Sequence, residues 1–319
     1  MEDHQPVMLE EVVKAISPRD GAIYVDGTFG GGSYSRALLE NAYCKVIGID
    51  RDPSVDEVTK SWRLKFGDRL LLLQGCFGDM AGLLERKGVC EVDGIALDLG
   101  VSSFQLDQPE RGFSFSKDGP LDMRMSKNGT SAVQVINEHK EDDLADIIFN
   151  FGEEKRARSI ARAITQARTK KPITRTVQLA QIVRRCFPNK KSRDNKDQAT
   201  RTFQALRVYI NDELGELERG LCAAEKLLKK GGNIAVVSFH SLEDRLVKKF
   251  FINRSRNSSQ PSRHLPSQTE NKNPTFTISS RRPIRPSDTE ISANPRARSA
   301  RLRTATKLGV SPYQGDNRL

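Results

Sequence analysis

The sequence is poor in the residues that build disulfides and metal centres. It has five cysteines and four histidines in 319 residues. The cysteines are scattered, odd in number and never form a Cys-x-x-Cys pair, which argues against a disulfide framework and against a zinc site. No two histidines are four residues apart, the spacing at which they share one face of a helix. We therefore predict reduced cysteines and no metal centre.

Long apolar runs are also missing. No stretch approaches the roughly 18 apolar residues that cross a bilayer. Residues 1–18 carry four acidic side chains, where a signal peptide would be basic and then apolar. We therefore expect a cytoplasmic protein with no membrane partner.

The chain is long and carries an excess of positive charge. A chain of 319 residues is long enough for two structural units. Its net charge of +11 is concentrated in two places. Residues 153–207 hold sixteen Lys or Arg and four Asp or Glu, and residues 281–307 hold eight and two. One charge run is more often a solvated helix surface than a binding site, but two such runs favour a phosphate backbone as partner.

The first hundred residues alternate short apolar runs with helical patterns, which is typical of βα units and a parallel sheet. The runs predict strands over residues 22–26, 45–50, 70–74 and 94–99, with helices over 34–40, 54–65 and 80–86. The chain is then loop-rich and afterwards helical, with helical spacing over residues 142–167, 176–186 and 202–209. The alternation resumes with a helix over 212–230 and a strand over 233–239.

The helical segment is thus predicted to be an insertion within one α/β domain. The expected parts are an α/β domain over residues 1–107, an inserted helical domain over 108–212, and the rest of the α/β domain over 213–319 with a basic C-terminal segment. Residues 255–274 are rich in Ser, Asn, Arg and Gln and predict a mobile loop. Two closing strands are expected over residues 275–279 and 300–306.

A glycine-rich turn follows the first predicted strand. Glycines let the backbone pass close to a ligand, and the next helix offers free amide groups. Such a turn also serves nicotinamide enzymes, but Ser33 and Tyr34 stand where the third glycine of G-x-G-x-x-G is expected. The turn alone is therefore weak evidence for any one cofactor.

Two carboxylates end neighbouring predicted strands. Asp50 ends the second strand, where a carboxylate accepts hydrogen bonds from the ribose of an adenosine. Asp98 adds acidity at the same edge, which suits a sulfonium and an ammonium group and would repel a pyrophosphate. Phe77, past the third strand, is a candidate for packing on adenine, although core packing is the more common role of such a residue.

Eight segments in order resemble the small-subunit (16S) ribosomal RNA (cytosine-N4) methyltransferase H family. They are residues 4–7, 26–30, 49–53, 97–103, 111–115, 120–125, 200–207 and 238–245. The resemblance runs from His4 to about Arg303 and covers nearly the whole chain. It implies a Rossmann-like S-adenosylmethionine methyltransferase sheet with an inserted all-helical domain for substrate recognition. It also implies S-adenosyl-L-methionine as the methyl donor and a cytidine in the decoding region of 16S ribosomal RNA, within the small subunit, as the target.

The resemblance also implies a set of cofactor contacts. They are Gly32, Ser33, Tyr34, Asp50, Phe77, Asp98 and Gln105, and Gly30 of the same turn is predicted as a further cofactor contact. Where the family usually reads Gly-Gly-His-Ser, this chain reads Gly32-Ser33-Tyr34-Ser35, which puts side-chain contacts at positions 33 and 34 in doubt and leaves backbone contacts open.

The chemistry expected is methylation of an exocyclic amine, which needs alignment with the methyl group and an acceptor for the amine proton. Methylation of a ring carbon would need a cysteine nucleophile, and residues 98–103 contain none. Asp98 is the candidate proton acceptor, with cofactor binding alone as the alternative. Amine methyltransferases of DNA carry Pro-Pro-aromatic after such a residue, and this chain does not.

Substrate contacts are predicted on aromatic and basic residues. Phe113, with Phe104 and Phe115 as further candidates, could receive an unstacked base, with anchoring of the loop to the core as the alternative. Arg124, Arg201 and Arg207 are candidates for RNA contacts, with salt bridges to nearby acids as the alternative. His240 follows the strand over 233–239 and either faces the site or has a structural role.

Three other functions remain open on the sequence alone. The chain could methylate an amine of a protein or of DNA, or it could be a ribosome-assembly protein that binds the cofactor without catalysis. A nicotinamide dehydrogenase is disfavoured by the missing glycine and by the acidic site. The sequence also leaves a homodimer open.

Overall fold

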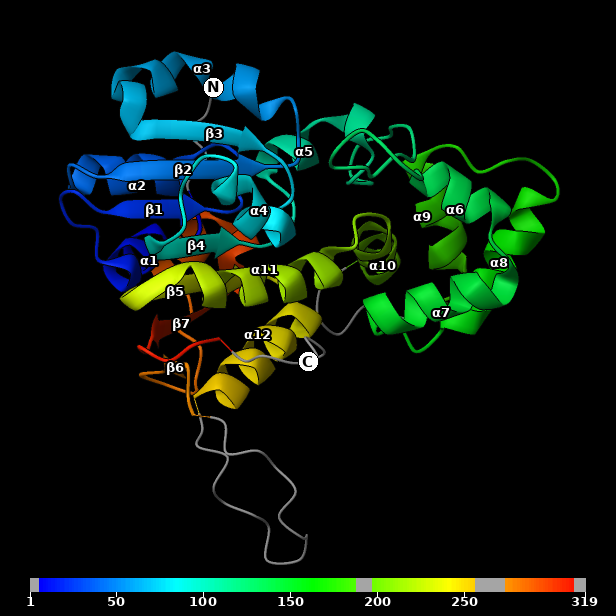
Figure 1. The fold of residues 1–319 in the computed structure, drawn as a ribbon. Helices are drawn as coiled ribbons and strands as arrows, with labels where there is room; N and C mark the ends of the chain where they lie inside the picture. The colour runs from blue at the N-terminus through cyan, green and yellow to red at the C-terminus, as the bar shows by residue number, and fades with distance from the viewer. Residues whose placement is uncertain (1–5, 188–196, 256–272, 313–319) are drawn as a thin grey trace, which may run out of the picture. The chain divides into compact units, whose positions relative to one another are not determined.

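The computed structural model describes residues 6–187, 197–255 and 273–312. It divides into two compact units, one formed by residues 1–100 and 214–319 and the other by residues 101–213 (Figure 1). His4 and most of the predicted mobile loop over 255–274 lie outside the described residues.

The first unit is built on a seven-stranded sheet with the order β3-β2-β1-β4-β5-β7-β6 (Figure 1). Its strands are β1 (Ile23–Asp26), β2 (Lys45–Asp50), β3 (Leu70–Gln74), β4 (Val92–Asp98), β5 (Leu228–Ser238), β6 (Phe276–Thr277) and β7 (Arg301–Lys307). The strands β1 to β5 pair in parallel, whereas β7 is antiparallel to both β5 and β6. All seven predicted strands are confirmed, and the sheet is mixed because the chain returns to it in the opposite direction at β7.

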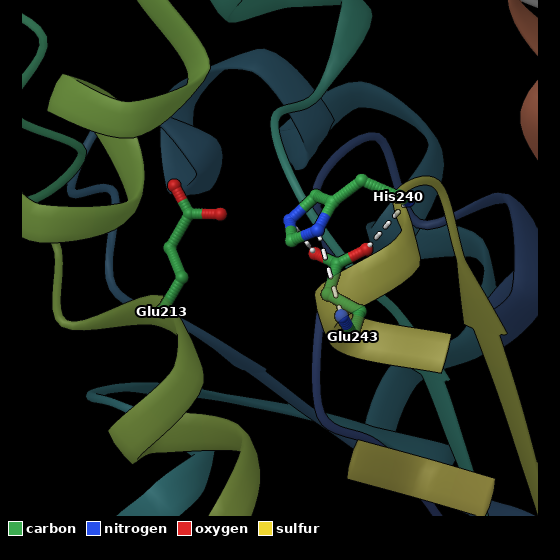
Figure 2. Close-up of side chains that lie close together, drawn as sticks. All are labelled: Glu213, His240 and Glu243. Carbon is green, nitrogen blue, oxygen red and sulfur yellow. Dashed lines mark hydrogen bonds and ion pairs between the residues drawn. The ribbon is translucent and has the colours of Figure 1, made fainter. Parts of the chain in front are cut away.

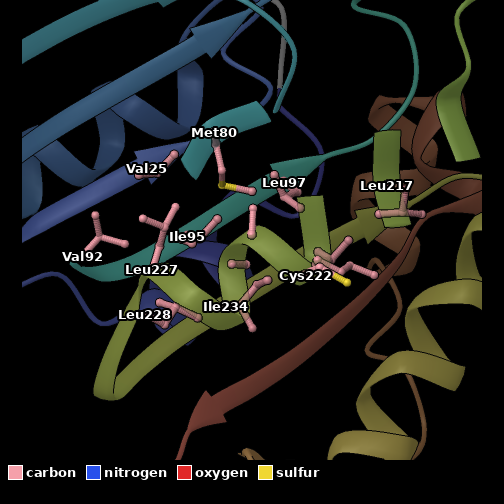
Figure 3. Packing of buried hydrophobic residues seen from close by; sticks show 14 of the residues in the cluster. Val25, Met80, Val92, Ile95, Leu97, Leu217, Cys222, Leu227, Leu228 and Ile234 are labelled. Carbon is pink, nitrogen blue, oxygen red and sulfur yellow. The ribbon is translucent and has the colours of Figure 1, made fainter. Parts of the chain in front are cut away.

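Two hydrophobic clusters cover the two faces of this sheet. Successive strand residues alternate between them: Tyr24 belongs to one cluster and Val25 to the other, and Ala96 likewise alternates with Ile95 and Leu97. Side chains of a strand point to opposite faces in turn, so both faces of the central strands are buried. Burial on both faces explains why these strands read as continuous apolar runs. Figure 3 shows part of one cluster, in which Ile95 and Leu97 of β4 pack with residues from α11.

Helices connect the strands of the first unit. They are α1 (Leu9–Ile16), α2 (Ser33–Asn41), α3 (Val55–Arg63), η1 (Leu64–Arg69), η2 (Phe77–Asp79), α4 (Met80–Glu85), α11 (Glu213–Leu227), α12 (Ser241–Arg254), α13 (Asp288–Ala293) and η4 (Pro295–Ser299). The predicted helices near 34–40, 54–65, 80–86 and 212–230 are present, the last ending at Leu227 because β5 begins at the next residue. The sequence pattern did not predict α1, α12 or α13.

The second unit is helical and has its own core. Its elements are α5 (Ser103–Asp107), η3 (Pro109–Arg111), α6 (Ala132–Glu138), α7 (Glu141–Gly152), α8 (Ala157–Arg168), α9 (Thr176–Arg185) and α10 (Thr200–Ile210). The helical spacing over 142–167 belongs to two helices, separated where Glu153 adopts a left-handed φ of 49°. Leu144, Ile148 and Ile160 are fully buried in the core that these helices share.

The helical unit stands in the chain between β4 and β5, so the predicted insertion into an α/β sheet is confirmed. Among the helices that the structure describes, none combines the length and the apolar character needed to span a membrane.

Candidate active site

The carboxyl edge of the parallel strands gathers three acidic residues. Asp26, Asp50 and Asp98 are the last residues of β1, β2 and β4. Because β1 lies between β2 and β4 in the sheet, the three carboxyl groups come from adjacent strands at one edge. Ligands of open α/β sheets bind at this edge.

The glycine turn between β1 and α2 is fastened to the neighbouring strands by its backbone. Gly27 N–H donates to the Ala96 carbonyl at 3.0 Å, and Phe29 N–H donates to the Ile49 carbonyl at 2.9 Å. Gly30 N–H donates to Asp50 Oδ2 at 2.7 Å. The turn is thus held by β4 on one side and by β2 on the other.

Gly32 and Phe29 fix the shape of this turn. Gly32 has a φ of +73°, and a Cβ atom there would lie 2.2 Å from the Trp62 ring. The Phe29 ring stacks on Trp62 with centroids 5.9 Å apart. A Cβ atom on Gly48 of β2 would meet the Phe29 ring at 2.3 Å. Glycine is therefore required at both positions for the turn to pack against β2 and α3.

Ser33 and Tyr34, where the chain departs from the family pattern, are the first two residues of α2. Tyr34 is 4% exposed and belongs to the core of the first unit. Its hydroxyl donates to the Val7 carbonyl at 2.5 Å. The Tyr34 side chain therefore serves packing, and a ligand at this helix start would meet backbone groups there.

Asp98 is the most isolated of the acidic groups. No hydrogen bond from the described residues reaches its buried Oδ1 atom, and no salt bridge to it is formed in that part of the chain. Its backbone N–H donates to Thr28 Oγ1 at 2.6 Å. Burial raises the pKa of Asp98 well above its usual range, and the negative charges of Asp26 and Glu243 raise it further. A group with these properties favours a cation or a proton beside it.

The other two carboxyl groups are better satisfied. Burial raises the pKa of Asp26 to about 6, although hydrogen bonds from Ser35 and Thr28 favour its charged form. Burial also raises the pKa of Asp50, against hydrogen bonds from the N–H groups of Asp52 and Gly30. All three pKa values are thus raised, and the edge of the sheet is set to bind positive charge.

Phe77 lies beside the glycine turn at the end of β3. A Cβ atom on Gly27 would lie 3.2 Å from Phe77 Cβ. The ring is partly exposed and packs against the hydrophobic cluster that includes α11. The predicted residues Gly30, Gly32, Ser33, Asp50, Phe77 and Asp98 all belong to the first unit, at the ends of β1 to β4.

His240 is the N-cap residue of α12. Glu243 N–H lies 3.5 Å from His240 Nδ1, and His240 Nε2 lies 3.1 Å from Glu243 Oε1 (Figure 2). Glu243 Oε2 accepts a hydrogen bond from Phe239 N–H at 2.8 Å. This reciprocal cap serves the first turn of α12, while the buried Nε2 atom of His240 has no hydrogen-bond partner among the described residues.

The predicted residues of the second unit lie in its core or at its helix ends. Gln105 is buried and forms a capping box with Ser102 at the start of α5. Phe113 is 7% exposed and belongs to the core, whereas Phe115 packs edge-on against Phe203 at 4.7 Å. Phe104 is half-buried on α5. The observed packing of Phe113 and Phe115 corresponds to the anchoring role left open by the sequence.

All three predicted arginines form ion pairs within the second unit, and the one of Arg201 is the longest. Arg124 contacts Asp122 at 2.7 Å, and Arg207 contacts Glu213 at 2.7 Å. The Arg201 side chain is 54% exposed and lies 3.9 Å from Glu154 Oε2. Arg201 is therefore the most accessible of the three.

Several residues that shape the site were missed by sequence reasoning. Trp62 of α3 supports the glycine turn, and Gly220 and Glu216 of α11 contact the Phe77 segment. Of these residues, only Gly220 could have been noticed in the sequence. A glycine inside a helix destabilises that helix by about 1 kcal/mol relative to alanine, so its presence there suggests that a neighbouring group packs against it.

A mixed sheet in the order 3-2-1-4-5-7-6, with a glycine turn after β1 and carboxylates ending β2 and β4, defines a Rossmann-like methyltransferase. The chain belongs to the MraW methylase family, whose model matches residues 1–308. The family resemblance noted in the sequence is thereby confirmed.

Similar proteins cover nearly the whole chain. It is 53% identical over 308 residues to the ribosomal RNA small subunit methyltransferase H of Rhodospirillum rubrum, covering 95% of this chain and 94% of that protein. It is 52% identical over 313 residues to the protein of the same name from Paramagnetospirillum magneticum, covering 98% of each. For the Rhodospirillum centenum protein of this name, the identity is 55% over 307 residues, covering 96% of this chain and 93% of that protein.

Proposed function

We propose that this protein transfers the methyl group of S-adenosyl-L-methionine to the N4 amine of a cytidine in the decoding region of 16S ribosomal RNA. Family membership and relatives named as ribosomal RNA small subunit methyltransferases support the reaction class and the RNA. The observation that carries the site is Asp98, a half-buried residue with a raised pKa, whose buried Oδ1 atom has no hydrogen-bond partner among the described residues. We also propose that the reaction takes place in the cytoplasm.

The first unit has the groups that a cationic adenosine derivative requires. Asp50 already accepts the Gly30 N–H and would hold the ribose hydroxyls with its remaining lone pairs. Gly32 and Ser33 would offer backbone groups, and Phe77 would pack on the adenine. Asp98 would face the positive sulfonium and ammonium groups, which supply the electrostatic partner that this carboxyl group lacks in the protein alone. Gln105, in the second unit, is a further proposed contact.

When bound, the cofactor supplies an electrophilic methyl group: the carbon–sulfur bond breaks, a carbon–nitrogen bond forms, and S-adenosylhomocysteine leaves. The protein must hold the amine in line and accept the proton that the amine loses. We assign that acceptor role to Asp98, because a carboxylate with a raised pKa is a stronger base than an exposed one.

RNA binding is assigned to the second unit, which contains residues 153–207 with their sixteen Lys or Arg and four Asp or Glu. Arg201 is the proposed phosphate contact, since its side chain is half exposed. Arg124 and Arg207 would contribute only after exchanging their carboxylate partners for RNA. Phe113 is buried in the core, so we propose that it orders the segment that meets the RNA.

The test is nucleoside mass spectrometry of 16S RNA after incubating undermethylated small subunits with the protein and labelled S-adenosylmethionine. Label is expected in N4-methylcytidine, with Asp50→Ala abolishing it through impaired cofactor binding and Asp98→Asn reducing it strongly. Free 16S RNA in a parallel reaction tells whether the assembled subunit is the substrate, and light scattering tests the homodimer.

Label in protein or DNA would move the assignment to another amine. Tight cofactor binding with no transfer to any substrate would instead favour an assembly role.

A further inference from the structure

Helix α11 contacts the segment that carries Phe77. A Cβ atom on Gly220, in the middle of α11, would lie 2.4 Å from Phe77 Cδ2 and 2.6 Å from Cε2. Real Cβ atoms do not approach so closely, and an aromatic ring has no flexible end that could give way. The ring of Phe77 therefore occupies the space that any other residue at position 220 would fill.

A second contact from the same helix holds the backbone next to Phe77. Glu216 is 7% exposed, and its Oε2 atom accepts a hydrogen bond from Gly78 N–H at 3.0 Å. Its Oε1 atom accepts one from Arg219 at 2.7 Å. Glu216 and Gly220 are four residues apart, so they lie on one face of α11.

Gly220 thus contacts the ring of Phe77, and Glu216 holds the backbone of the next residue, Gly78. On its other side Phe77 abuts Gly27, the first residue of the glycine turn. Phe77 is thus held between the turn and α11, and its position is set by residues far away in the sequence.

We infer that Gly220 and Glu216 are positioning residues that set the affinity for the adenine of the cofactor through Phe77. This inference rests on the proposed function, in which Phe77 packs on that ring. Neither residue touches the reacting groups, so their effect belongs to cofactor binding and not to the transfer step.

Gly220→Ala is the first test, with Gly82→Ala as its matched control. Gly82 also lies in a helix, but a Cβ atom there meets only the end of the Arg86 side chain, at 3.6 Å. Calorimetric titration with S-adenosylmethionine is expected to give a Kd raised about tenfold for Gly220→Ala, equivalent to about 1.4 kcal/mol, and no change for Gly82→Ala. The KM for the cofactor should rise likewise, while kcat at saturating cofactor and the KM for RNA stay unchanged.

A double-mutant cycle tests whether the effect passes through Phe77. Phe77→Leu removes the ring that meets position 220, so adding Gly220→Ala to it is expected to raise the Kd less than twofold further. At position 216, Glu216→Gln keeps an oxygen for Gly78 N–H and should retain affinity, whereas Glu216→Ala should reduce it.

The outcomes separate the two proposals. If Phe77→Leu weakens cofactor binding but Gly220→Ala and Glu216→Ala do not, the positioning role is wrong and the proposed function stands. Additive effects of Gly220→Ala and Phe77→Leu would also overturn the positioning role. If the unaltered protein binds no S-adenosylmethionine, both proposals fall.

Discussion

Asp98 is half-buried at the end of β4, and the described residues leave its buried Oδ1 atom without a hydrogen-bond donor. Because burial raises its pKa, the folded protein holds this proton more tightly than the unfolded chain does. Ionisation of Asp98 therefore costs folding free energy, and stability falls as the pH rises from the unfolded pKa of about 3.9 through the higher folded value.

Asp98→Asn should consequently stabilise the ligand-free protein at alkaline pH while weakening cofactor binding. Its Tm at pH 8 is expected to exceed that of the unaltered protein, by about 2–4 °C for each kcal/mol recovered. The difference should shrink as the pH falls through about 4, because Asp98 then becomes protonated in the unfolded chain as well. Scanning calorimetry at the two pH values checks this, and a lower Tm for the variant at pH 8 would mean that the Asp98 carboxylate is stabilising.

Asp26 predicts a pH dependence of cofactor affinity. Its pKa is raised to about 6, so the site gains negative charge between about pH 5 and pH 7. Affinity for the cationic cofactor should rise with pH across that window, by no more than about tenfold per pH unit for each proton released. Titrations of the unaltered protein and of Asp26→Asn measure this. An equally steep rise in the variant would show that another group titrates.

At the scale of elements, two adjacent glycines of the turn are expected to respond differently to substitution by alanine. Gly32→Ala introduces a Cβ atom 2.2 Å from Trp62 at a φ of +73°, whereas a Cβ atom on Gly31 meets nothing within 4 Å. Gly32→Ala is therefore expected to lower the Tm and raise the cofactor Kd at least tenfold, and Gly31→Ala to leave the Tm unchanged. Thermal melts with and without cofactor decide it, and tolerance of Gly32→Ala would mean that α3 can move away from the turn.

The sequence predicted strands better than short helices. The central strands are buried on both faces, so each is an apolar run bounded by polar residues. The helices α6 and α13 have seven and six residues, too few for a helical period to repeat clearly. The start of β5 at Leu228 was predicted as helix because its apolar residue continues the spacing of α11.

The site was predictable where it depends on strand ends and not where it depends on packing between distant residues. Asp50 and Asp98 were found because a parallel strand delivers its last residue to the ligand-binding edge. The contact of Gly220 with Phe77 and the stack of Trp62 on Phe29 join residues that are far apart in the sequence, so no local sequence pattern predicts them.

For the molecule as a whole, charge predicts how RNA binding responds to salt. The second unit carries Arg158, Lys170 and Lys171, which are exposed and form no salt bridge within the part of the chain that the structure describes. Replacing all three by alanine should weaken RNA binding and flatten its dependence on salt. The slope of log K against log salt is expected to fall by about 0.7 to 0.9 for each phosphate that the protein no longer neutralises.

Lys60→Ala with Lys87→Ala serves as the control, since both lysines are exposed in the first unit. Filter binding of 16S RNA at several salt concentrations measures both slopes. An equal weakening in the control variant would place the RNA-binding surface outside the second unit or make the binding unspecific.

The stack of Trp62 on Phe29 also has an optical consequence. The chain contains a single tryptophan, and that residue lies against the glycine turn beside Gly32. All of the protein's indole emission therefore originates beside the candidate cofactor site. The protein thus carries an intrinsic fluorescent probe of that turn, with which ligand occupancy can be followed in real time without any label.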